Sequence, residues 1–200
     1  MTPTIGVAAA ERELGVVVDS LREITVGVHA TGDRRAGEGA GVIWHRDGLL
    51  VTNAHCVRQR RLSVRTADGR SFDADVVAHD RRLDLALLEA PGVRGRAPML
   101  GDVESLRAGE LLLALGHPLG VQGALALGVL HAVARDPRSG DVRWVCADVR
   151  LAPGNSGGPL ADAAGRVVGI NSMIAGGLGL AIPTAVVQRF VARVRPALAA

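Results

Sequence analysis

The sequence predicts an all-β protein of two lobes that ends in a C-terminal helix. Its apolar residues fall in many short runs, separated by glycine-containing turns such as Arg46–Gly48 and Ala67–Gly69. Such runs are typical of a barrel or a sandwich, and not of alternating βα units. The pattern occurs twice, on either side of a loop at 90–98 that is rich in proline, glycine and arginine. Near the C-terminus the apolar residues instead recur at helical spacing.

The first lobe is expected at residues 24–105, after an N-terminal segment at 1–23. A short helix is predicted in that segment, because four apolar residues recur at helical spacing: Leu14, Val17, Val18 and Leu21. A strand follows at 24–30, where Ile24, Val26 and Val28 alternate toward the interior, and then a polar loop from Thr31 to Glu38. The remaining strands of this lobe are predicted at 40–45, 49–53, 62–66, 72–79 and 84–88.

The second lobe is expected at residues 106–183, followed by a helix at 184–200. Its predicted strands lie at 111–116, 123–134, 142–148, 158–162, 166–173 and 178–182. Thr184 is suited to cap the helix, whose apolar face comprises Val186, Val187, Phe190, Val191 and Val194. The arginines on this helix, Arg189, Arg193 and Arg195, are interpreted as a solvated face.

The segment Gly154–Leu160, with the sequence Gly-Asn-Ser-Gly-Gly-Pro-Leu, suits a sharp backbone bend that presents a serine hydroxyl beside backbone amides. A serine nucleophile also needs a general base, normally a histidine, and a carboxylate to orient it. All six histidines precede Ser156, and only Asp162 follows it among acidic residues. The serine elbow of α/β-hydrolases takes both partners after the serine, so that fold is excluded.

His55 is the best candidate base and Asp84 the best candidate acid. Each lies at the edge of an apolar run that predicts a strand, and the order along the chain is histidine, aspartate, serine. Asp80 is an alternative acid four residues earlier and is otherwise a turn residue.

These segments make the chain similar to the chymotrypsin-like serine proteases, and within them to the HtrA/Deg branch. The resemblance covers about residues 24–184 and depends on ordered motifs: Gly39–Ile43, Asp47–His55, His79–Asp84, Gly109–Gly120, Gly154–Leu160, Gly169–Ser172 and Leu180–Pro183. It implies two Greek-key β-barrels packed across a catalytic cleft, with His55 and Asp84 from the first and Ser156 from the second. No peptide-binding PDZ domain is expected after the final helix.

The resemblance also implies roles for neighbouring residues. Gly154 and Ser156 would donate backbone N–H groups to an oxyanion, and Asn155 would shape the turn that aims them. Ser172 occupies the position that commonly bonds the catalytic aspartate. The segment Ser172, Met173 and Ile174 would pair with an extended substrate backbone.

The residue before the scissile bond is expected to be valine, alanine or leucine, because Leu151 and Ile174 suggest a small apolar pocket. Arg150 lies where digestive relatives have the residue at the base of this pocket, which would favour acidic side chains. Strand alternation places Asp148 on the same face as Arg150, so the two are expected to pair.

Composition excludes several other classes. The basic residues are all arginine, the net charge is only +3, and the aromatic residues are Trp44, Trp144, Phe72 and Phe190, so nucleic-acid binding is not supported. No apolar run is long enough for a membrane span. Cysteine and histidine spacing predicts no metal site, and no cofactor is expected. Cys56 and Cys146 are expected to be buried thiols, and the protein to be cytoplasmic if Met1 is its native start.

The sequence therefore predicts a serine endopeptidase that acts on extended polypeptides through an acyl-enzyme on Ser156. Two alternatives stay open. One is a protease-fold module that binds peptides with little turnover, which departures from the family pattern at His117 and at Ala126–Val129 would fit. The other is a small-ester hydrolase. A monomer is favoured, because trimeric relatives use N-terminal aromatic residues and residues 1–30 contain none.

Overall fold

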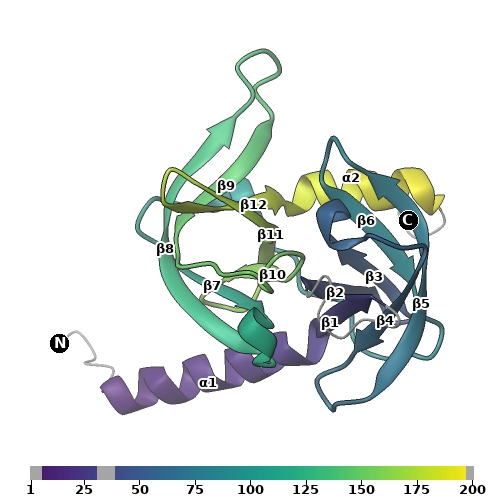
Figure 1. The fold of residues 1–200 in the computed structure, drawn as a ribbon. Helices are drawn as coiled ribbons and strands as arrows, with labels where there is room; N and C mark the ends of the chain where they lie inside the picture. Colours follow the sequence, from purple (N-terminus) through teal and green to yellow (C-terminus); the bar gives the residue numbers. More distant parts are fainter. Residues whose placement is uncertain (1–5, 31–38, 197–200) are drawn as a thin grey trace.

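The computed structural model describes residues 6–30 and 39–196. It consists of two closed, six-stranded antiparallel barrels that lie side by side, with one helix at each end of the described chain (Figure 1). The all-β, two-barrel prediction is confirmed. The polar loop expected from Thr31 to Glu38 lies outside the described residues, as do the two chain ends at 1–5 and 197–200.

The first barrel has the strand order β1-β2-β3-β6-β5-β4. β3 pairs with β6, so consecutive strands are not always neighbours and the order is that of a Greek key. The strand bounds are β1 Thr25–Ala30, β2 Gly39–His45, β3 Leu49–Thr52, β4 Arg61–Arg65, β5 Ser71–Asp80 and β6 Leu85–Glu89.

The second barrel repeats this order, with β9 beside β12 and β7 closing onto β10. Its strand bounds are β7 Leu111–Gly116, β8 Ala124–Arg135, β9 Val142–Asp148, β10 Pro159–Asp162, β11 Val167–Ala175 and β12 Leu178–Pro183. Because closure leaves few free sheet edges, the unpaired strand segments that remain stand out as places where another chain can bind.

The apolar core has three parts. One cluster fills the first barrel around Val26, Leu50 and Leu88, and another fills the second barrel around Leu112 and Leu160. The third joins residues of both barrels and both helices, including Leu87, Leu115 and Phe190. This third cluster holds the barrels together, because buried apolar side chains from both barrels and both helices pack in it.

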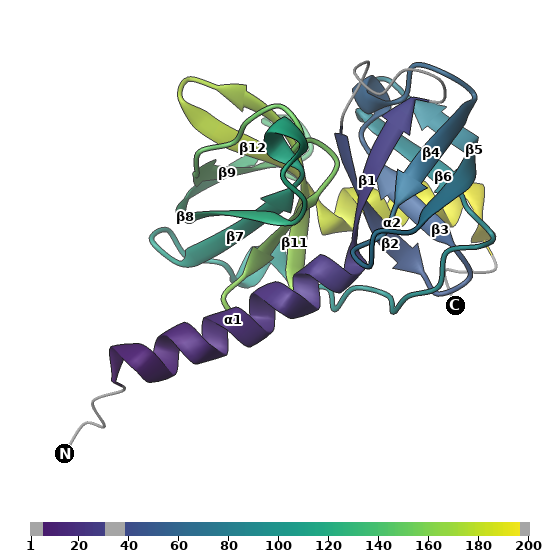
Figure 2. The ribbon, with the colours of Figure 1, turned by 60° about the horizontal axis from the view of Figure 1, so that its bottom comes forward.

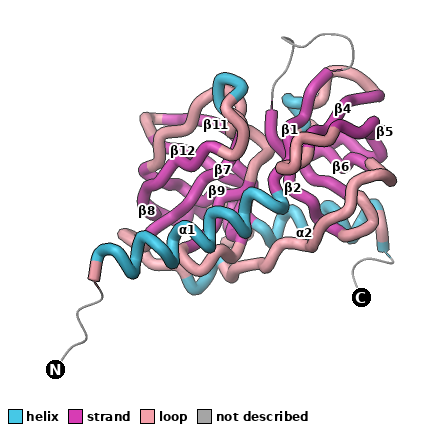
Figure 3. The backbone as a smooth tube through the Cα atoms, turned by 90° about the horizontal axis from the view of Figure 1, so that it is seen from below, coloured by secondary structure: helices cyan, strands magenta, loops and turns pink. Residues whose placement is uncertain are grey.

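Helix α1, Val7–Ile24, lies along one side of the second barrel and leads directly into β1 (Figures 2 and 3). Val18 and Leu21 on its buried face belong to the cluster between the barrels. Ile24 was expected to begin the first strand, but it is the last helical residue. The helix continues because its apolar face is already buried, and packing of such a face outweighs local strand preference.

Helix α2, Thr184–Val194, packs its buried residues Val187, Phe190 and Val191 between the barrels. Thr184 does not cap it: the N-cap is Pro183, and the Thr184 hydroxyl donates to the Gly101 carbonyl at 3.3 Å. Within 6–30 and 39–196, no helix is long and apolar enough to cross a membrane.

Arg189 and Arg193 on this helix are exposed, as expected of a solvated face, but two of the three arginines also form ion pairs. Arg193 pairs with Asp80 at 3.0 Å, and Arg195, just after the helix, pairs with Glu89 at 2.7 Å. Both carboxylates belong to the first barrel, whereas α2 follows the last strand of the second. The contacts therefore connect the end of the chain to the first barrel, although exposed pairs of this kind stabilise a fold by only about 0–1 kcal/mol each.

Candidate active site

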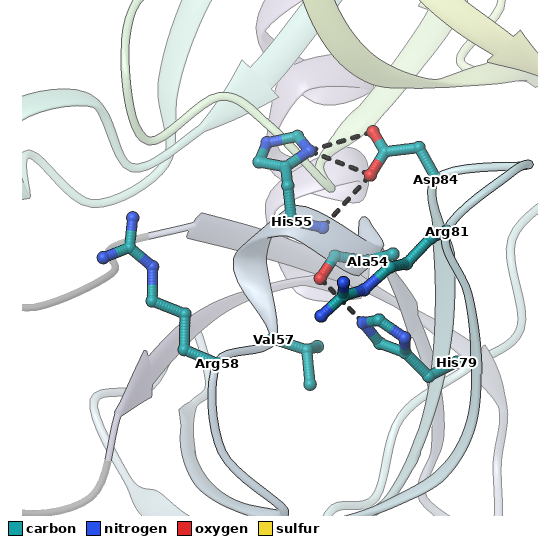
Figure 4. Close-up of a pocket in the computed structure, with 7 residues that line it drawn as sticks. All are labelled: Ala54, His55, Val57, Arg58, His79, Arg81 and Asp84. Atoms are coloured by element: carbon teal, nitrogen blue, oxygen red, sulfur yellow. Dashed lines mark hydrogen bonds and ion pairs between the residues drawn. The ribbon is translucent and has the colours of Figure 1, made fainter.

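His55 and Asp84 come from adjacent strands of the first barrel. β3 ends at Thr52, and a short 3-10 turn, Ala54–Cys56, turns the His55 imidazole outward. Asp84 precedes β6, which pairs with β3. The Nδ1 of His55 lies 2.9 and 3.0 Å from the two carboxylate oxygens of Asp84, and the His55 backbone N–H donates to Oδ1 at 3.1 Å (Figure 4).

Asp84 is held from several sides. Its backbone has φ 54, a left-handed conformation that aspartate adopts more readily than most residues and that is common at functional sites. The fully buried Asn53 donates its side-chain N–H to the Asp84 carbonyl at 3.0 Å. The Ser172 hydroxyl, from the second barrel, donates to Asp84 Oδ2 at 2.6 Å. These contacts fix the carboxylate where it meets the imidazole.

Asp80 does not compete for His55. Its Oδ1 accepts the backbone N–H groups of Arg82 and Leu83, and its Oδ2 pairs with Arg193. Asp80 therefore shapes the turn before Asp84 and faces helix α2.

The charges of the pair stabilise each other. The pKa of His55 is raised from 6.5 to about 10, first by its hydrogen bond to Asp84 and next by one to Cys56. Burial acts to raise the pKa of Asp84, but the hydrogen bonds from His55 and Ser172 outweigh it and keep the pKa below its usual value. Asp84 is thus poised to stabilise an imidazolium, the form that His55 takes after accepting a proton.

The Ser156 turn is attached to both barrels. The Ser156 carbonyl accepts the Ala40 N–H of β2 at 2.7 Å, and the Gly157 N–H donates to the Asn171 carbonyl of β11 at 2.8 Å. Gly157 has φ +86, and a Cβ there would lie 2.0 Å from the Ala40 carbonyl oxygen. Only glycine fits this position, so the glycine after the serine is required by the close approach of the two barrels.

The Ser156 hydroxyl joins the same network through Ser172. It donates to the Ser172 carbonyl at 3.0 Å, while the Ser172 side chain bonds Asp84. Of the hydrogen bonds among residues 39–196, none joins this hydroxyl to His55. The Ser156 hydroxyl and the His55 imidazole must move closer before the proton can pass between them, and such tightening on substrate binding is common for catalytic hydrogen bonds.

The predicted oxyanion donors are available. A turn closed by the Asn155 N–H and the Ala152 carbonyl at 2.9 Å places Gly154 at φ +103. The Gly154 carbonyl is directed away from Ser156 and accepts the His117 N–H at 2.9 Å. Within the part of the chain that the structure describes, the N–H groups of Gly154 and Ser156 meet no acceptor. The turn therefore offers two amides beside the serine hydroxyl, as an oxyanion hole requires.

Gly154→Ala is expected to lower kcat by about 10²–10³-fold, the usual cost of losing an oxyanion donor. A Cβ at this position would lie 2.4 Å from the His117 carbonyl oxygen, so the turn must shift. The measurement is kcat on a peptide substrate. Gly140→Ala is the matched control, because Gly140 has φ +76 but open space around it. Equal kcat values for the two variants would contradict the role of this turn.

One edge of β11 is open beside the serine. β11 pairs with β10 only as far as Ile170, whereas it pairs with β12 as far as Ala175. Met173 and Ile174 on this segment are 44% and 56% exposed. A strand edge of this kind can accept an extended peptide by backbone pairing.

The candidate pocket for the residue before the scissile bond lies next to this edge. The Leu151 side chain packs over Gly179, where an added Cβ would meet Leu151 Cδ1 at 2.9 Å and Val149 Cγ1 at 2.8 Å. The expected pairing of Asp148 with Arg150 is not found among the described ion pairs. Both side chains are exposed, and strand alternation alone does not bring their charged ends together.

Two contacts were not anticipated from the sequence. Asn53 holds the Asp84 backbone, and Asn171 donates its side-chain N–H to the Pro159 carbonyl at 2.9 Å, behind the Ser156 turn. Both are buried amides beside predicted site residues, and that position in the sequence was the only signal that could have pointed to them.

Cys56 and Cys146 are free thiols, of which Cys56 is buried and Cys146 half-buried. Among the described residues, no cluster of three or more His, Cys, Asp or Glu side chains could hold a metal ion.

Comparisons with known proteins agree with this geometry. The trypsin-like peptidase domain family matches residues 39–170. Serine protease HTRA1 of Xenopus laevis is 36% identical over 166 residues, which cover 78% of this chain and 36% of that protein. A probable periplasmic serine endoprotease, DegP-like, of Halomonas elongata is 37% identical over 150 residues, which cover 74% of this chain and 32% of that protein. The chain spans about a third of the length of these curated relatives.

The fold comparison agrees as well. The solved structure of the HtrA-type protease AlgW with a tripeptide has a TM-score of 0.81 and 29% sequence identity, covering 92% of this chain and 64% of that one. The chain therefore belongs to the trypsin-like peptidase domain family, and its relatives include HtrA- and DegP-type serine proteases.

Proposed function

We propose that this protein is a serine endopeptidase that hydrolyses extended polypeptides. The observation that carries the proposal is the hydrogen-bonded network from His55 through Asp84 and Ser172 to Ser156, beside two unpaired amides. The open edge of β11 supplies a place for the substrate backbone next to this network.

The reaction follows from these positions. The Ser156 oxygen attacks the substrate carbonyl carbon while His55 accepts the hydroxyl proton, and the Gly154 and Ser156 amides hold the resulting oxyanion. The C–N bond breaks as His55 returns the proton to the leaving amine, which leaves an acyl-enzyme on Ser156. Water then attacks the ester with His55 again as base, releasing the acid and the free serine.

Specificity for a small aliphatic residue before the scissile bond is part of the proposal. Leu151 packs over Gly179 and so narrows the candidate pocket beside Ile174. A narrow pocket suits valine, alanine or leucine better than an aromatic side chain. Profiling a peptide library tests this, and a preference for aspartate or glutamate at that position would assign the pocket to Arg150 instead.

A peptide-binding module is the second candidate. It is favoured by the Ser156 hydroxyl bonding the Ser172 carbonyl instead of the His55 imidazole. If this arrangement persisted with a peptide bound, the protein would bind extended chains on β11 without cleaving them.

Labelling with a fluorophosphonate separates the two candidates. An enzyme is expected to label stoichiometrically at Ser156 and to lose labelling in Ser156→Ala, because only an activated serine reacts with this reagent at a useful rate. Casein cleavage together with slow small-ester turnover would identify a protease, and the reverse an esterase. Absence of labelling in the folded protein would leave the binding module as the better description.

That the protein is a monomer stays a prediction. Sedimentation velocity would test it by measuring the molecular mass in solution.

A further inference from the structure

A recess of about 540 Å³ lies beside His55, on the side of the imidazole that faces the first barrel. Figure 4 shows Val57 beneath it and Arg58 on one side, with Arg81 and His79 on the other. Neither the catalytic roles proposed above nor the fold accounts for this group of basic side chains.

The two arginines of the recess have no carboxylate partner in the described structure. The acidic residues around them are already engaged: Asp84 binds His55 and Ser172, and Asp80 binds Arg193. His79 is fixed as well, because its Nε2 donates to the Ala54 carbonyl at 3.0 Å. The two guanidinium groups outnumber the one carboxylate, Asp84, that also lines the recess, so the recess carries an excess of positive charge next to the imidazole.

Strand geometry indicates which part of a substrate would reach this recess. In an extended peptide paired with the open edge of β11, successive side chains point to opposite faces. The residue at the scissile bond would direct its side chain into the second barrel, toward Leu151. The preceding residue would then face the first barrel, where His55, Arg58 and Arg81 lie.

We propose that this recess is a subsite for a carboxylate side chain on the substrate, at the second residue before the scissile bond. Guanidinium groups bind carboxylates with charge-assisted and often bidentate hydrogen bonds, so glutamate or aspartate fits here better than an uncharged side chain. The inference depends on the peptide-binding mode of the proposed function, but not on turnover.

The test uses two fluorescent peptides that differ only by glutamate or glutamine at this position. Their affinity for the Ser156→Ala protein is measured by anisotropy at low salt. The glutamate peptide is expected to bind roughly fivefold more tightly, the upper range for a partly exposed ion pair, and its advantage is expected to shrink with added salt. Arg58→Gln combined with Arg81→Gln is expected to bring the two affinities to within a factor of about 1.5.

Arg138→Gln is the control for losing an arginine outside the recess, because it removes one positive charge from the β8–β9 turn and is expected to keep the glutamate preference. The inference would be overturned if the Ser156→Ala protein bound the two peptides equally well, or if its preference for glutamate survived the double substitution. A third peptide, with glutamate at the residue directly before the scissile bond, tests separately whether Arg150 attracts an acidic side chain. If the Ser156→Ala protein prefers the glutamate peptide but the unsubstituted protein cleaves neither peptide, the subsite stands and the endopeptidase proposal fails.

Discussion

Replacing His55 by alanine is expected to lower kcat by about 10⁶-fold, the cost typical of removing the base from such a group of residues. Without the imidazole, no other side chain in the described part of the chain is placed to act as the base for Ser156, since the Asp84 carboxylate is occupied by Ser172 and the His55 backbone N–H. The residual rate would come from the two amides and from peptide binding. The measurement is single-turnover cleavage of a fluorogenic peptide at high enzyme concentration.

His131→Ala is the control for this variant, because His131 is an exposed histidine on β8, away from the network. We expect it to keep the parent kcat. The effect of His55→Ala should also not add to that of Ser156→Ala, because the two residues act as a unit. If His55→Ala retained more than about a hundredth of the parent rate, another group would have to be the base.

Replacing Asp84 by asparagine is expected to lower kcat by about 10⁴-fold with little change in the fold. Asparagine tolerates the left-handed backbone at φ 54, so the turn should survive. Its amide, however, neither stabilises an imidazolium nor keeps the Nδ1 proton in place. The imidazole proton can then reside on Nε2, which leaves no lone pair on that nitrogen to accept the serine proton.

The pH dependence supplies an independent check on Asp84. Activity requires neutral His55, so kcat/KM rises as the imidazolium loses its proton. Because Asp84 raises the pKa of His55, the parent midpoint is expected above 6.5. Removing the carboxylate removes the main cause of that shift, so the Asp84→Asn midpoint should move to lower pH. A profile with an unchanged or higher midpoint would contradict the assignment, and thermal melting of both proteins controls for folding.

The strands were predictable because their side chains alternate and their turns carry glycine. β7 at Leu111–Gly116 and β9 at Val142–Asp148 have the predicted bounds, and the other strands differ from prediction by one or two residues at an end. Boundaries that depend on packing were less predictable. Ile24 continues α1 and Thr184 starts α2 without capping it, because neighbouring elements bury both segments.

The candidate site shows the same division. The order of His55, Asp84 and Ser156 along the chain, and the glycines around the serine, are local features that predict a nucleophile and its partners. The clamp by Asn53 on Asp84, the contacts of Arg193 with Asp80 and of Arg195 with Glu89, and the recess beside His55 involve residues from separate elements. Spacing along the chain carries no information about such contacts.

The sequence by itself determined the strand pattern, the serine turn and the residue types available for catalysis, because these depend on neighbours along the chain. Only the tertiary structure decided that the Ser156 hydroxyl bonds the Ser172 carbonyl, and that Arg58 and Arg81 line one cavity and form no ion pair with a carboxylate of the described residues. Which donor meets which acceptor is determined by how two closed barrels pack against each other, and that packing is a property of the whole chain.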